Sequence, residues 1–201
     1  MAEPRLLNLA LQGGGAHGAY TWGVLDRLLE DGRFTFDGVT ATSAGAMNAV
    51  VMAQGLLDGG NDGAREALAA FWQAISDGGR MFSPIRRLPW ETPAGWQFEP
   101  PASFALFDVL TRVVSPYQFN PLNFNPLRAI VERHVDFARL RERTPLRLFI
   151  NATNVQNGRV RSFRTREVTA DVVMAAACLP FLFQAVEVDG AAYWDGGYTG
   201  N

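Results

Sequence analysis

The chain has 201 residues, of which 20 are acidic and 18 basic, and its formal net charge is −2. This length is typical of one domain, and 48% apolar with only 19% charged residues predicts a sizeable hydrophobic core rather than disorder. The near balance of charge excludes a polybasic nucleic-acid-binding protein as the default interpretation. Every basic residue is an arginine, so chemistry that needs a lysine, such as Schiff-base formation, is excluded.

The sequence shows no pattern of a disulfide framework, a membrane span or a signal peptide. The single cysteine, Cys178, excludes an intrachain disulfide framework and a cysteine-based metal cluster. No segment reaches the ~20 consecutive apolar residues of a membrane span, and the N-terminus lacks the pattern of a signal peptide. We expect a cytoplasmic protein whose membrane contact is at most peripheral. The sequence carries no signal of oligomeric state.

The first elements in chain order are two strand–helix units. Residues 6–11 form a short apolar run, typical of a buried strand, that stops at three glycines. Residues 16–30 have helical spacing, residues 34–42 are predicted as a second strand, and a helix over 44–57 follows with almost no loop. This order predicts an α/β fold with a mostly parallel sheet and helices on both faces.

The rest of the chain predicts further elements around an irregular middle. A loop over 58–63 precedes a helix that contains residues 68–75, whereas residues 84–126 hold eight of the 11 prolines and show helical spacing only over 104–114. A helix over 126–135 follows, capped by Asn125. Strands over 146–155 and 159–163 flank the hairpin signal Asn157-Gly158. A helix begins at Thr169 and ends at Pro180, and the last strand is predicted over 184–194.

The first motif is the glycine loop Gly13-Gly14-Gly15-Ala16-His17-Gly18, between the first strand and the first helix. Such a loop directs backbone N–H groups, supported by the helix dipole, at an anion. Its spacing also satisfies the dinucleotide pattern G-x-G-x-x-G, and Asp37 lies at about the right distance downstream to bind a ribose. A tight turn without a ligand is the simplest alternative.

The second motif is Ala41-Thr42-Ser43-Ala44-Gly45, where a strand turns directly into a helix. This is the setting of a nucleophile elbow, whose pattern is G-x-S-x-G, with Ala41 here in place of the first glycine. The serine of an elbow takes a strained backbone conformation, so small residues are required two positions to either side. Taken alone, Ser43 could equally be a helix N-cap.

The third motif, Asp195-Gly196-Gly197, follows the last predicted strand. A carboxylate followed by two glycines can be held close to another backbone segment. A plain turn explains the same three residues equally well.

Taken together and in this order, the three motifs resemble the patatin-like phospholipase family, the Ser-Asp lipid acyl hydrolases. The family pattern is a G-G-G-x-[RK]-G loop, a G-x-S-x-G elbow and a D-G-[GA] turn, and the resemblance spans residues 6–197. The chain departs from it at His17, which replaces a basic residue, and at Ala41. The resemblance implies that Ser43 is the nucleophile and Asp195 the general base. It also implies an oxyanion hole formed by Gly13, Gly14, Gly15 and Ala16, and supporting roles for Gly18, Ala41, Gly45, Gly196 and Gly197.

This resemblance implies a lipid acyl hydrolase that cleaves carboxylic esters of phospholipids or lysolipids through a serine acyl-enzyme. It implies a lipid ester as the partner and no cofactor, no metal and no nucleic acid. An aspartate with a pKa near ~3.9 is a weak base for a hydroxyl. The dyad therefore requires a closed site that desolvates Asp195 and raises its pKa.

Two alternatives stay open. An α/β-hydrolase esterase with a Ser-Asp-His triad would need a histidine outside this chain, because only six residues follow Asp195 and neither His17 nor His134 is suitably placed. A non-catalytic Rossmann-type nucleotide-binding module explains the glycine loop and Asp37 but leaves the other two motifs unexplained.

Three expectations concern the remaining parts of the chain. A single patatin-like domain over residues 1–201 is expected to continue beyond Asn201. Residues 84–126, rich in proline and aromatic residues, are expected to cover the site, with Trp90 and Trp96 facing an acyl groove or a bilayer; a purely structural excursion is the alternative. Cys178 is expected in the core, and the arginines at 159, 161, 164 and 166 on a solvated strand face.

Overall fold

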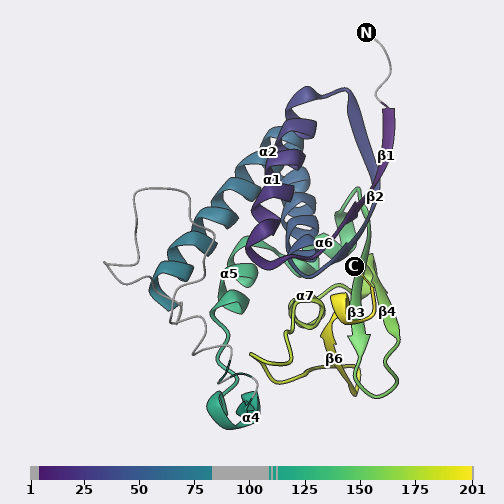
Figure 1. The fold of residues 1–201 in the computed structure, drawn as a ribbon. Helices are drawn as coiled ribbons and strands as arrows, with labels where there is room; N and C mark the ends of the chain where they lie inside the picture. Colours follow the sequence, from purple (N-terminus) through teal and green to yellow (C-terminus); the bar gives the residue numbers. More distant parts are fainter. Residues whose placement is uncertain (1–4, 83–108, 110, 112, 201) are drawn as a thin grey trace.

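The computed structural model describes residues 5–82, 109, 111 and 113–200. Its centre is a six-stranded sheet of order β1-β2-β3-β6-β5, in which β4 also pairs with β3 (Figure 1). The first three strands are parallel, and the pairs that involve β4, β5 and β6 are antiparallel. Helices flank the sheet, so the predicted α/β fold class is confirmed. The strands are β1 (Arg5–Leu11), β2 (Phe34–Thr42), β3 (Arg147–Asn154), β4 (Val160–Arg164), β5 (Val186–Val188) and β6 (Ala191–Asp195).

The helices begin and end close to the predicted positions, with four differences. The helix predicted to end at Pro180 ends at Ala176 instead. α2 consists of two helices that join at Gly59 and Gly60, so the predicted loop over 58–63 is reduced to a short kink. α4 and α6 are short helices that the sequence pattern did not predict. The elements are η1 (Gly15–His17), α1 (Gly18–Asp31), α2 (Ala44–Phe82), α4 (Pro116–Phe119), α5 (Pro126–His134), α6 (Phe137–Arg143), η3 (Thr165–Glu167), α7 (Ala170–Ala176) and η4 (Gly196–Tyr198).

The two halves of α2 pack tightly because glycines line their contact. A Cβ atom added to Gly55 would lie 2.4 Å from the Gly63 carbonyl oxygen, and one added to Gly63 would lie 2.5 Å from the Gly55 carbonyl oxygen. Only glycine permits backbones to approach this closely. The kink therefore allows the second half of α2 to fold back along the first.

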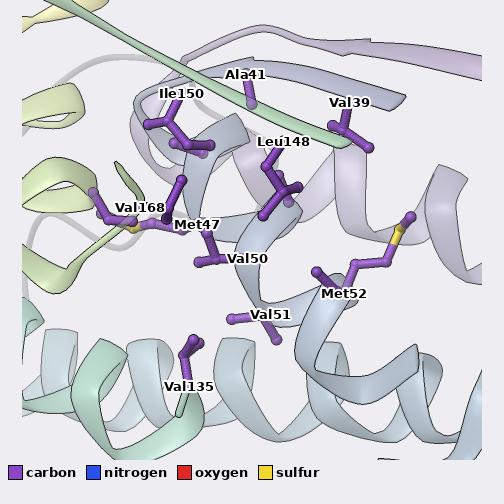
Figure 2. Packing of buried hydrophobic residues seen from close by; sticks show 14 of the residues in the cluster. Val39, Ala41, Met47, Val50, Val51, Met52, Val135, Leu148, Ile150 and Val168 are labelled. Carbon is purple, nitrogen blue, oxygen red and sulfur yellow. The ribbon is translucent and has the colours of Figure 1, made fainter. Parts of the chain in front are cut away.

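The core lies between the sheet and the first half of α2. Alternate residues of β2 and β3 point towards this helix, as the period of two along a strand requires (Figure 2). The fully buried members include Val39, Leu148 and Ile150 from the strands and Val50 and Val51 from the helix. Because α2 starts at the end of β2, this packing fixes the position of the helix N-terminus.

The predicted last strand is wrong in one respect. Residues 184–194 form a hairpin of β5 and β6, which turns at Asp189 (φ 52°) and Gly190 (φ 75°). Asp-Gly is a hairpin signal of the same kind as Asn157-Gly158. The apolar residues around it obscured this signal and made the segment resemble one continuous strand.

Arg161 is also placed differently from the prediction. Its guanidinium donates hydrogen bonds to the Tyr193 hydroxyl at 2.9 Å and to Asp189 at 2.8 Å. It also lies over the Phe163 ring, 4.3 Å from the ring centroid. Arg161 is therefore half-buried and ties β4 to the β5–β6 hairpin, instead of lying on a solvated face.

The predicted helix over 104–114 and the proposed cover fall largely outside the described residues. Trp90 and Trp96 both lie in the part of the chain that the structure does not describe. Cys178 is buried, as predicted.

Strands β2 and β6 approach each other end to end along one edge of β3. β2 runs parallel to β3 up to the pair Thr42–Asn151, whereas β6 runs antiparallel to β3 and ends at the pair Asp195–Ala152. β4 pairs with β3 over both stretches, so β2 and β6 share the opposite edge. Their C-terminal ends therefore meet at consecutive residues of β3, and this brings the residue after Thr42 next to Asp195.

Candidate active site

The glycine loop connects β1 to α1 through backbone conformations that side chains disfavour. Gly14 has a φ of 155° and Gly15 a φ of 56°, and both values lie in regions that glycine adopts without steric cost. His17 Nδ1 lies 3.0 Å from the Gly14 carbonyl oxygen. Because a carbonyl only accepts, Nδ1 is the donor in this contact. His17 thus closes the loop on itself instead of facing the site.

Ser43 lies in the tight turn between β2 and α2. Its φ of 51° is in the left-handed region, which is uncommon for a residue with a side chain. The turn is held by a hydrogen bond of 3.0 Å from the Ser43 N–H to the Ala176 carbonyl. Ala41, two residues earlier, is buried.

Gly45 explains why the first turn of α2 lies against the glycine loop. A Cβ atom at this position would lie 2.2 Å from the Leu11 carbonyl oxygen and 2.8 Å from the Gln12 carbonyl oxygen. Glycine at position 45 is therefore required because the backbone at the end of β1 lies so close, and not only because of the turn at Ser43.

Asp195 is fixed by its backbone and by one carboxylate oxygen. Its N–H donates to the Cys178 carbonyl at 2.8 Å, and its own carbonyl accepts from the Thr153 hydroxyl at 2.9 Å. Oδ1 accepts from the Gly197 N–H at 2.8 Å. The residue is 4% exposed, and Oδ2 is buried without a hydrogen-bond partner among the described residues.

This environment changes the acidity of the carboxyl group. Burial raises the pKa of Asp195 above its ordinary value, and hydrogen bonding from the Ser43 side chain and from the Gly197 N–H lowers it in part. Desolvation is the largest of these effects. The group is therefore a better proton acceptor than an aspartate in water.

One short turn anchors the backbones of both residues. Ser43 binds to the Ala176 carbonyl and Asp195 to the Cys178 carbonyl, so the end of α7 sets their separation. The Cys178 thiol donates to the Gln184 carbonyl at 3.1 Å, which stabilises this turn. Burial raises the pKa of the thiol to about 11. Cys178 is therefore a structural group and not a nucleophile.

The three motifs line one pocket of about 350 Å³. Its wall is formed by the three glycines of the loop, by Ser43, and by Asp195 with Gly197. Leu179 and Tyr198 complete the lining. Neither residue was predicted from the sequence. Leu179 lies within an apolar run that indicated only a core. Tyr198 directly follows the third motif, so proximity to Asp195 was the one signal available.

The remaining motif residues lie around this pocket and pack its walls. A Cβ atom on Gly196 would lie 2.4 Å from the Asn151 carbonyl oxygen, and one on Gly18 would lie 2.7 Å from the Ala44 Cβ. Asn48, which the sequence analysis missed, is buried and donates to the Gly18 carbonyl at 3.0 Å. It also accepts from the Trp72 indole at 2.8 Å. This pair joins the start of α1 to both halves of α2.

Residues proposed for other chemistry lie elsewhere. Neither histidine of the chain lines the pocket, and His134 Nδ1 lies 2.8 Å from the Ile130 carbonyl oxygen on α5. Asp37 forms an ion pair with Arg147. It lies within β2 at a break in the strand register, several residues before the strand end that faces the glycine loop.

The described residues contain neither a metal-binding cluster nor a membrane-spanning helix. No group of three His, Cys, Asp or Glu side chains in that part of the chain is arranged to hold a metal ion. None of the helices over the same residues combines the length and hydropathy needed to span a bilayer.

The fold and the sequence are similar to those of known proteins. The structure is similar to a crystal structure of VipD from Legionella pneumophila, with a TM-score of 0.51 and 18% sequence identity over 98% of this chain and 46% of that chain. ExoU in the ExoU–SpcU complex of the type III secretion system of Pseudomonas aeruginosa gives a TM-score of 0.35 and 21% identity over 87% of this chain and 36% of that chain.

The first of these similarities shows the fold alone, and the chain spans less than half the length of either protein. No curated protein matches the sequence. The sequence does match the patatin-like phospholipase family over residues 9–201. Because this match covers nearly the whole chain, the protein belongs to the patatin-like phospholipase family.

Proposed function

We propose that this chain hydrolyses carboxylic ester bonds of phospholipids or lysolipids through a serine acyl-enzyme, with Ser43 as nucleophile and Asp195 as general base. One observation carries the proposal. Ser43 on its strained turn and the buried Asp195 carboxylate line the same pocket as the glycine loop. Family membership supports lipid hydrolysis as the general activity.

The reaction would proceed in two steps. Ser43 Oγ attacks the ester carbonyl carbon while Asp195 Oδ2, the oxygen without a partner, takes the hydroxyl proton. The tetrahedral intermediate collapses, the alcohol leaves with the proton from Asp195, and the acyl group stays on Ser43. A water molecule then attacks the acyl-enzyme, with Asp195 again as the base.

Burial supports the role of Asp195 as base. A general base works best when its pKa approaches the operating pH, and desolvation raises the pKa of this carboxyl group. The Gly197 N–H holds Oδ1 at 2.8 Å, which leaves Oδ2 available for the proton.

The glycine loop supports the second requirement, stabilisation of the oxyanion. We propose that N–H groups of residues 13–16 donate to the developing negative charge, helped by the dipole at the start of α1. Loss of one such donor typically costs ~2.7–4 kcal/mol of transition-state stabilisation.

The dinucleotide alternative has little support in the structure. A ribose-binding acid would have to lie at the end of β2 next to the glycine loop, whereas Asp37 lies within the strand and pairs with Arg147. The triad alternative would require a histidine from outside the chain.

The experiment that tests the proposal is hydrolysis of a soluble short-chain p-nitrophenyl ester and of dispersed phosphatidylcholine. We expect Ser43→Ala and Asp195→Asn each to reduce kcat at least ~10³-fold, and the double variant to lose little more, since residues that act as a unit are non-additive. His134→Gln serves as the control and should retain parental activity. Retention of most activity by folded Ser43→Ala would remove Ser43 from the mechanism.

A further inference from the structure

A group of large apolar side chains is exposed on the segment that surrounds α4. Leu122 is 91% exposed, Tyr117 and Phe124 are each 60% exposed, and Phe119 is 45% exposed. Phe181, on the loop that contacts this segment, is 40% exposed. Exposed apolar clusters on a soluble domain usually mark a contact surface. α4 lies at the periphery of the molecule, beyond the end of α5 (Figure 1).

The exposure is built into the local structure. The Ser115 hydroxyl caps α4 and the Gln118 side chain binds back to the cap, which completes a capping box. Asn120 accepts from the Phe124 N–H at 2.8 Å and donates to the Phe124 carbonyl at 3.1 Å, so its side chain closes the following turn. These bonds fix the backbone that carries the exposed apolar side chains.

The segment is attached to the loop that leads to the candidate site. Gln184 Nε2 donates to the Asn120 carbonyl at 3.0 Å and to the Pro121 carbonyl at 3.2 Å. The Gln184 carbonyl accepts from the Cys178 thiol, and the Cys178 carbonyl holds the Asp195 N–H. Leu179, between Cys178 and Phe181, lines the pocket. The exposed apolar group and the pocket therefore share one short stretch of chain.

The segment around α4 carries no charged side chain. Residues 113–127 contain no Asp, Glu, Lys or Arg, although 19% of the chain is charged. The polar side chains among them are neutral: serine, glutamine, asparagine and a tyrosine hydroxyl. Neutral polar groups around aromatic and leucine side chains match the boundary between zwitterionic headgroups and acyl chains.

We propose that Tyr117, Phe119, Leu122, Phe124 and Phe181 form an apolar platform that inserts into the surface of a zwitterionic bilayer. This inference rests on the proposed function, because a lipid surface is where an ester substrate would enter the adjacent pocket. Insertion depends on burial of apolar area and not on charge, so binding should withstand high salt.

The test is flotation of the full chain with phosphatidylcholine vesicles in the Ser43→Ala background, which prevents hydrolysis of the vesicles. We expect Phe119→Ser/Leu122→Ser to weaken partitioning at least tenfold. Leu6→Ser is the matched control, since Leu6 is a 64% exposed leucine on β1, and it should partition like the parent. Partitioning of the parent should be the same in 0.1 M and 1 M NaCl. An unchanged double variant, or a parent that does not float, would overturn the platform.

A second measurement separates this proposal from the proposed function. With Ser43 intact, Phe119→Ser/Leu122→Ser should hydrolyse a soluble short-chain ester at the parental rate and lose activity only on vesicles. A parent that floats but cleaves no ester would overturn the esterase and leave the platform standing. Sedimentation without lipid tests the other occupant: a dimer that the double variant dissociates would make this surface an interface between copies and overturn the lipid proposal.

Discussion

Ser43 has a backbone conformation that lowers stability but suits the proposed chemistry. A left-handed φ of 51° costs a side-chain-bearing residue about 1–2 kcal/mol, and the hydrogen bond to Ala176 helps to hold the turn against this cost. A serine that served only as a helix N-cap would take an extended conformation instead. The strain therefore favours a functional interpretation of the turn.

This strain predicts a stability difference between two inactive variants. Ser43→Gly should be more stable than Ser43→Ala by about 1 kcal/mol, because glycine adopts the left-handed region freely and alanine does not. Urea denaturation of both proteins measures the difference. Equal stabilities would show that the turn stores no strain.

Asp195 must ionise to act as a base, although it is buried in a site that disfavours the ionised form. Because burial raises its pKa in the folded state, the ionised carboxylate destabilises the fold. The penalty is absent below the ordinary pKa of an aspartate and grows as the pH rises through the raised folded value.

Asp195→Asn should therefore be inactive and yet more stable than the parent at pH 8, by about 1 kcal/mol or more. The gain should shrink as the pH falls, because the parental carboxyl group becomes neutral as well. Melting temperatures of both proteins between about pH 8 and pH 4 measure this trend. A variant that is less stable at pH 8 would contradict the inferred burial of charge.

At the scale of elements, close backbone contacts hold the glycine loop and the serine turn together. Gly45→Ala should destabilise the protein by about 3 kcal/mol or more, because its Cβ would lie 2.2 Å from the Leu11 carbonyl oxygen. Gly23→Ala is the matched control. Gly23 is also helical but has no atom within 4 Å of its added Cβ, so alanine should stabilise α1 by about 0.5–1 kcal/mol. Thermal melts of both variants test the contrast, and a harmless Gly45→Ala would show that the first turn of α2 can shift.

Patterns of neighbouring residues were sufficient to predict most helices and strands. The elements that they did not predict have physical reasons. The apolar run of β1, the turn at Ser43, the Asn125 cap and the helix start at Thr169 are each contained in a few neighbouring residues, and the structure confirms them. The β5–β6 turn was missed because its signal, Asp189-Gly190, lies between apolar residues. α6 was missed because seven residues are too few to display a helical period.

At the scale of the whole molecule, the sequence could indicate the motifs but not their meeting point. Ser43 and Asp195 converge because β2 and β6 end at consecutive residues of one edge of β3. That register depends on how three strands pair, so it cannot be predicted from any one of them. The contribution of Leu179 and Tyr198 to the pocket depends on the same register, so residue type alone could not reveal it.

The measurement that tests the central claim most directly is covalent labelling with an alkyl fluorophosphonate, followed by intact-mass analysis and peptide mapping. An activated serine displaces fluoride from phosphorus, so we expect one adduct per chain, located on Ser43. Labelling should be at least tenfold slower in Asp195→Asn, because the base is missing, and should slow as the pH is lowered and Asp195 becomes protonated. An unlabelled Ser43, or labelling at the same rate without the Asp195 carboxylate, would contradict the dyad.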